Sequence, residues 1–167
     1  MKKITLLAIL AIAAFSNNAN AQSTASATAA ATIVTPIAIS NTAPMSFGNV
    51  AVTGTGGTVV LLAGGGRNST GGLTLPTTKG KVTAASFNVT GTAEYAYYVK
   101  LPTGPVELTG TSDSDKMGVT DFTSSLLGDG NLKDGTQTFT VGATLNVKDN
   151  QVAGAYTGSF NVTVNYN

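Results

Sequence analysis

Residues 138–147 read TFTVGATLNV, and residues 154–166, after a short break, read GAYTGSFNVTVNY. In both stretches nearly every second residue is apolar, while threonine, serine and asparagine take most of the positions between them. Successive side chains of a β-strand point to opposite faces, so this alternation is typical of a strand with one buried and one exposed face. The linker KDNQVA between the two stretches predicts that they pair as an antiparallel hairpin. A fully buried Val, Leu or Phe contributes roughly 1.5–3 kcal/mol, so this pair of strands can anchor a β core.

Similar short runs recur upstream, separated by turns rich in Gly, Asn and Asp. Residues 59–62 read as a short buried strand, and Phe47 is expected to be a core anchor. Arg67, the only arginine, lies in GGGRNST and is expected at an exposed hairpin tip. No stretch of the mature chain keeps a helical period. The pattern therefore predicts an all-β fold, an antiparallel two-sheet sandwich.

The first 21 residues have the three parts of a secretory signal peptide. Lys2 and Lys3 form a charged start, residues 4–15 are an apolar run too short to span a bilayer, and residues 19–21 read ANA, a small-residue cleavage signal. We expect cleavage after Ala21 and export to the periplasm, the cell surface or the extracellular space.

Residues 22–35 are predicted to form an extended N-terminal segment, and residues 36–167 the sandwich domain. The segment alternates small apolar with hydroxyl-bearing residues, which is a strand pattern built from the smallest apolar side chains. Two interpretations remain open: a disordered leader before the first strand, or a strand that completes the sheet edge of another subunit.

The composition limits the possible chemistry. The chain has no His, no Cys and no Trp, which excludes Ser-His-Asp triads, His-ligated zinc and Cys-His dyads. The whole chain has nine basic and eight acidic residues, and without Lys2 and Lys3 the basic count is 9 − 2 = 7. The chain then carries a slight negative charge, so nucleic acid is not an expected partner. No catalytic, metal-binding or cofactor-binding residue is predicted, and no transmembrane helix. The middle of the chain carries scattered acids, interpreted as turn formers, with calcium as the alternative: Asp113, Asp115, Asp121, Asp129 and Asp134.

Several motifs point to one family. They are FGNV (residues 47–50), GGTV (56–59), GGLTLP (71–76), AASFNVTG (84–91), VGATLNV (141–147) and GAYTGSFNVTVNYN (154–167). Together they resemble the secreted bacterial domain-of-unknown-function family 4402, over nearly the whole mature chain. These motifs are structural rather than catalytic.

More distantly, the chain's ending is similar to the final strand of chaperone–usher pilin subunits, which also carry a penultimate tyrosine, here Tyr166. This resemblance implies an incomplete immunoglobulin-like sandwich, filled by the N-terminal extension of a neighbour. It implies a donor face made of Ala25, Ala27, Ala29, Ala31 and Ile33. It implies an acceptor groove lined in part by Phe160, Val162 and Val164.

The first functional hypothesis is therefore a non-enzymatic, fimbrial-type or adhesin-like surface subunit that associates with itself or with other subunits by strand addition. A second is a monomeric glycan-binding module that uses Tyr95, Tyr97 and Tyr98. A third is a small outer-membrane β-barrel.

Overall fold

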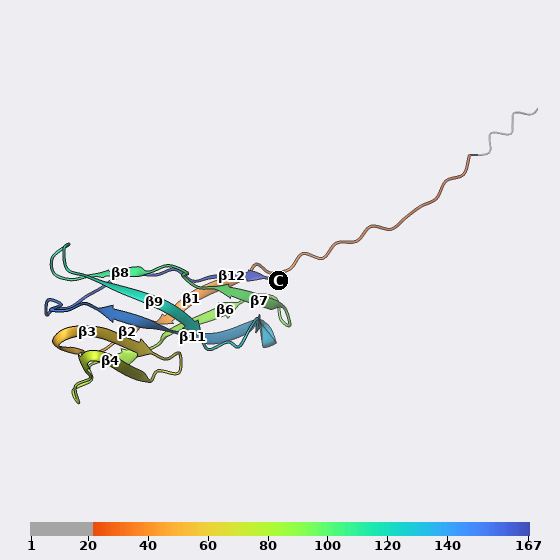
Figure 1. Cartoon of the computed structure of the whole chain (residues 1–167). Coiled ribbons are helices and arrows are strands. Elements are labelled where there is room, and N and C mark those ends of the chain that lie inside the picture. The colour runs from red at the N-terminus through yellow and green to blue at the C-terminus, as the bar shows by residue number, and fades with distance from the viewer. Residues whose placement is uncertain (1–21) are drawn as a thin grey trace, which may run out of the picture. The chain divides into compact units, whose positions relative to one another are not determined.

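The computed structural model describes residues 22–167, and the predicted signal peptide lies outside these residues (Figure 1). The described chain is built from strands, one 3₁₀ turn (Lys133–Gly135) and loops, with no α-helix in residues 22–167, so the all-β prediction is confirmed. The strands are β1 (Ala38–Ala43), β2 (Ser46–Phe47), β3 (Ala51–Leu61), β4 (Arg67–Thr74), β5 (Val82–Thr83), β6 (Ala85–Thr90), β7 (Ala96–Lys100), β8 (Val106–Thr109), β9 (Lys116–Ser124), β10 (Gly130–Asn131), β11 (Thr136–Val147) and β12 (Thr163–Tyr166). Residues 34–167 form one compact unit, and the described residues 22–33 lie outside it.

The strands belong to three antiparallel sheets. The largest has the order β1-β6-β11-β3-β4, with β9 also paired to β11 and β8 paired to β9. A second sheet has the order β10-β7-β12, and β2 pairs with β5 in a small third sheet. Strand β11 is the longest and holds the largest sheet together.

Both edges of β11 are occupied. Val141 pairs with β6 and with β9, and Thr144 pairs with β3 and with β9. Strands β6 and β3 therefore share one edge of β11, one after the other, while β9 takes the opposite edge. Gly142 lies at the junction, where a Cβ atom would overlap the carbonyl oxygen of Leu61 in β3. A glycine at this position lets three strands meet on one.

The predicted C-terminal hairpin is wrong. Strand β11 forms as expected, but the second stretch is a strand only at Thr163–Tyr166, and it pairs with β7 in the other sheet. The physical reason is that β11 offers no free edge, because β6, β3 and β9 already use its backbone groups. The chain after β11 crosses to the second sheet instead.

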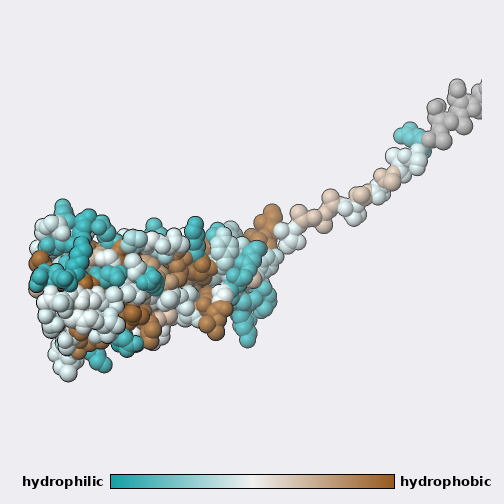
Figure 2. All heavy atoms as spheres, viewed as in Figure 1, coloured by the Kyte–Doolittle hydropathy of each residue, from teal (hydrophilic) through white to brown (hydrophobic). Residues whose placement is uncertain are grey.

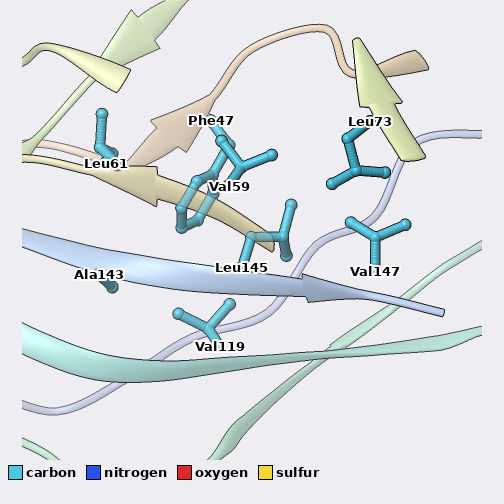
Figure 3. Packing of buried hydrophobic residues seen from close by; sticks show 8 residues of the cluster. All are labelled: Phe47, Val59, Leu61, Leu73, Val119, Ala143, Leu145 and Val147. Atoms are coloured by element: carbon cyan, nitrogen blue, oxygen red, sulfur yellow. The ribbon is translucent and has the colours of Figure 1, made fainter. Parts of the chain in front are cut away.

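The core consists of two clusters. The first lies along β3, β9 and β11 and is drawn in Figure 3; it contains Phe47, Val59, Leu61, Leu73, Val119, Ala143, Leu145 and Val147. The second joins residues of the largest sheet to residues of the β10-β7-β12 sheet; it contains Ala85, Phe87, Val89, Tyr97, Leu132, Phe139, Val141 and Val164. The predicted buried face of β11 and the core position of Phe47 are confirmed.

Candidate functional site

A groove with a volume of about 930 Å³ opens in the compact unit, and most of the side chains that line it are apolar. That volume lies at the upper end of the range of roughly 300–1,000 Å³ typical of ligand pockets. The floor of the groove is the apolar face of β8, β9 and β11. The floor residues are Val106, Leu108, Met117, Val119, Phe122, Leu145 and Val147. Two further stretches line it, the N-terminal wall (residues 44–52) and the C-terminal wall (residues 151–160).

The N-terminal wall is held in place by hydrogen bonds to β4 and to the loop before β5. The Arg67 guanidinium donates through Nη1 to the carbonyl oxygens of Phe47 and, at 2.8 Å, Asn49. The backbone N–H of Asn49 donates to the carbonyl of Lys79 at 2.7 Å. Gly48 between them has φ of +68°, and a Cβ there would overlap the same Lys79 carbonyl. These contacts fix the wall against β4 and the loop before β5.

Arg67 thus differs from its prediction as an exposed hairpin tip. It begins β4, is half-buried, and serves as a hydrogen-bond donor to the groove wall. A lone arginine in a Gly-rich stretch gives no sequence signal for this role, because its partners are backbone carbonyls 18 and 20 residues away.

The C-terminal wall has far fewer backbone contacts. Its sequence alternates as a strand does, yet within residues 22–167 its only ladder contact is one isolated bridge between Thr157 and Thr109 of β8. In that bridge each residue's N–H donates to the other's carbonyl, at 2.8 and 3.0 Å. From there to the start of β12, no backbone hydrogen bond joins residues 158–162 to any other part of the described chain. Polar backbone groups along one side of the groove are therefore open to a further partner.

Phe160 connects this wall to the core. Its ring centroid lies 4.9 Å from that of Phe122 in β9 and 6.3 Å from that of Phe87 in β6. Of the three predicted acceptor residues, Phe160 lines the groove. Val162 is half-buried and Val164 is buried, and both pack with the second core cluster rather than lining the groove.

The five predicted donor residues lie within the N-terminal segment. Ala25, Ala27, Ala29, Ala31 and Ile33 are all exposed and outside any strand, and Ile33 is 97 % exposed. Figure 2 shows weakly hydrophobic and near-neutral residues alternating along this segment. An apolar residue left this exposed has surface available to bury.

Sequence reasoning missed most of the groove floor. Its residues follow period two along β8 and β9, at Val106 and Leu108 and at Met117 and Val119, which is a signal present in the sequence. Both methionines of residues 22–167, Met45 and Met117, line the groove. Methionine is flexible and adapts to irregular apolar partners.

The groove is lined mainly by apolar side chains, with a few Asn, Gln, Ser and Thr side chains among them. Lys81 is the only charged residue that lines it. Within residues 22–167 no three His, Cys, Asp or Glu side chains gather as a metal site. Elsewhere, Lys116 pairs with Glu107 at 2.9 Å, and this hydrogen bond raises the pKa of the lysine. The groove can therefore bury apolar side chains and accept backbone hydrogen bonds.

The three tyrosines of the glycan hypothesis do not form one platform. Tyr97 is fully buried, and burial raises the pKa of its hydroxyl. Tyr95 and Tyr98 are 42 % and 44 % exposed, and the Tyr95 ring packs edge-on against Tyr166 at 5.4 Å. Within the described residues, no helix has the length and apolar character needed to cross a membrane.

No curated protein and no solved structure matches this chain. One family model does, and its match covers residues 37–166, from the residue before β1 to the last residue of β12. The chain therefore belongs to the family described as Domain of unknown function (DUF4402).

Proposed function

We propose that this protein is a non-enzymatic structural subunit of the cell surface, fimbrial or adhesin-like in type, that assembles by β-strand addition. Its domain is a pilin-like, immunoglobulin-like sandwich. Its groove receives the extended N-terminal segment of a neighbouring subunit. The predicted signal peptide exports it to the periplasm, the cell surface or the medium.

The observation that carries the proposal is the unpaired backbone of residues 158–162 beside an apolar groove. The sequence there alternates like a strand, and Phe160 already faces the core, but no second strand lies alongside it in the described chain. An extended peptide laid against such an edge gains main-chain hydrogen bonds, and the pockets below it take alternate side chains. The groove supplies both.

The N-terminal segment matches this site in pattern and length. Its apolar positions recur at every second residue, so one face can enter the groove while the hydroxyl-bearing face stays toward water. From Ala25 to Ile33 the segment advances eight residues, about 26 Å when extended. The C-terminal wall, residues 151–160, contains a similar number of residues.

The packing of the second core cluster supports the sandwich interpretation. Tyr97 and Val164 come from the β10-β7-β12 sheet and pack with Phe87 and Phe139 of the largest sheet. The rings of Phe87 and Phe139 stack with centroids 5.5 Å apart. Two sheets that share one apolar layer are what a sandwich requires. Over the first cluster the second layer is incomplete, and the groove lies there.

Size measurement on the mature protein tests the proposal. We expect concentration-dependent assemblies from mature protein and monomers after deletion of residues 22–31. A sharper pair of variants places two negative charges on either face of the segment. Ala27→Asp with Ala29→Asp should abolish assembly, because the charges would enter an apolar groove.

The matched control is Ser26→Asp with Thr28→Asp, which adds the same charge to the opposite face. It should still assemble. If the two charged pairs of variants assemble alike, or if the deletion leaves assembly unchanged, the segment does not bind the groove as a strand. The proposal then fails.

A further inference from the structure

Thr35, the last residue of the N-terminal segment, is held by a small hydrogen-bond network, the root clamp, formed by Thr35, Thr92 and Tyr166. The Tyr166 hydroxyl accepts the backbone N–H of Thr92 at 2.7 Å and donates to the carbonyl of Thr35 at 2.8 Å. The Thr92 hydroxyl accepts the backbone N–H of Thr35 at 2.9 Å. Both backbone polar groups of Thr35 are therefore used, and residues 131 positions apart meet at one point.

The root clamp lies at one end of β1, and the groove begins toward the other. Beyond the clamp, β1 pairs along β6 from Ala38 opposite Thr90 to Asn41 opposite Phe87. Asn41 and Phe87 line the groove. The chain thus runs from the clamp toward the groove, and a segment entering the groove of its own domain must reverse direction before Thr35.

The sequence before Thr35 is unsuited to a reversal. Residues 31–34 read ATIV, with three β-branched residues and no Gly, Asn or Asp. Tight turns depend on those missing residue types, and β-branched residues resist positive φ. Thr35 precedes Pro36, which disfavours helical backbone at Thr35 and pushes it toward extended conformations. The stiff residues 31–34 therefore lead directly into Thr35, which the root clamp holds in place.

We propose that Tyr166 is a positioning residue that keeps the N-terminal segment out of its own groove, so that strand addition occurs only between copies of this chain. This inference rests on the proposed function. Each copy then offers one segment and one groove, and such a heterologous contact joins copies head to tail.

Tyr166→Phe removes the clamp's central hydroxyl and keeps the ring that packs against Tyr95. The matched control is Tyr95→Phe, which removes a neighbouring tyrosine hydroxyl outside the clamp. Hydrogen exchange on monomers at low concentration reads out whether residues 22–33 are protected. With the two hydrogen bonds of the Tyr166 hydroxyl lost, the fraction of monomers with a protected segment should rise roughly tenfold in the Tyr166→Phe variant and stay unchanged in the control.

An insertion tests the same point without touching the core. Asn-Gly-Gly-Asn placed between Ile33 and Val34 supplies the missing turn and should yield protected, concentration-independent monomers. Thr-Val-Thr-Val at the same place adds equal length without a turn and should leave assembly between copies intact. This pair keeps the inference testable even if Tyr166→Phe fails to fold.

The outcomes separate the two claims. Wild-type monomers with a protected segment would overturn the inference while strand addition itself stands. A segment that stays unprotected in monomers and in concentrated samples alike would overturn the proposed function. Equal behaviour of both insertions, or of Tyr166→Phe and Tyr95→Phe, would remove the positioning role.

Discussion

The ring of Phe160 packs against the ring of Phe122, with centroids 4.9 Å apart and planes tilted by 43°. This contact joins the C-terminal wall to β9, at a place where the wall has no ladder to hold it. The Phe160 side chain therefore attaches the wall to β9, which backbone hydrogen bonds do not do here. It also forms part of the groove lining, so its packing shapes the candidate site.

Replacing Phe160 with alanine should destabilise the domain by about 2–3 kcal/mol. A fully buried Phe→Ala change costs roughly 3–5 kcal/mol, and Phe160 is only half-buried. Urea denaturation of a form lacking residues 22–31 would measure this without interference from assembly. Val152→Ala in the same wall is the control: Val152 is 55 % exposed, so its truncation should change stability by less than about 0.5 kcal/mol. Equal effects of the two would mean that Phe160 does not anchor the wall.

Gly142→Ala should destabilise the domain by about 1–3 kcal/mol or more. The new Cβ would overlap the Leu61 carbonyl and lie 2.6 Å from the backbone nitrogen of Ala63, and backbone atoms cannot rotate away. Strand β3 would have to move off β11. Gly118→Ala in β9 is the matched control, because a Cβ there meets nothing within 4 Å and the change should be neutral or slightly stabilising. Thermal unfolding of both variants checks the difference.

Tyr97→Phe should raise the free energy of unfolding at neutral pH by about 1 kcal/mol. The Tyr97 hydroxyl is buried and has no hydrogen-bond partner in the described chain, and an unmade hydrogen bond costs stability. Tyr98→Phe, at an exposed position on the same strand, should change stability by less than about 0.5 kcal/mol. A loss of stability in the Tyr97→Phe variant would show that the hydroxyl is satisfied after all.

The same residue gives a pH dependence. Burial raises the pKa of Tyr97 above its ordinary value of 10.0, so the unfolded chain releases this proton first. Where the folded state binds more protons, stability falls as pH rises. Stability should therefore be unaffected by Tyr97 below pH 10 and should decline above it. Urea titrations at several alkaline pH values should show a shallower decline in the Tyr97→Phe variant, and parallel curves would contradict the assignment.

The buried face of β11 could be predicted from sequence because it depends on a local period. Phe139, Val141 and Leu145 alternate with threonine and asparagine, and all three are buried. The partner of a strand depends on which edges are free, and that is a property of the whole sheet. The sequence of residues 154–166 carries a strand pattern throughout, but within the described chain only Thr163–Tyr166 forms a strand ladder, and Thr157 makes a single isolated bridge.

The residues around the groove also divide into those that the sequence could place and those that it could not. The resemblance to pilin subunits implies a groove position for Phe160, and Phe160 lines this groove. Arg67 could not be placed from the sequence, because its backbone-carbonyl partners leave no pattern in the sequence. The root clamp was equally hidden, since Tyr166 and Thr35 lie 131 residues apart in the sequence and meet only in the fold.

Oxidation of Met45 and Met117 should weaken the binding of a synthetic peptide spanning residues 22–33. Both side chains are half-buried in the groove, so a peroxide can reach them and transfer one oxygen atom to each thioether, giving a sulfoxide and water. A polar sulfoxide facing an apolar occupant carries a desolvation cost, so the peptide's Kd should rise about tenfold. Calorimetry before and after peroxide treatment of protein lacking residues 22–31 measures the change. The variant with Met45→Leu and Met117→Leu keeps similar volume without sulfur and should bind the peptide equally well before and after treatment. If peroxide weakens binding to both proteins alike, the methionines are not the cause, and the peptide does not contact the groove floor as proposed.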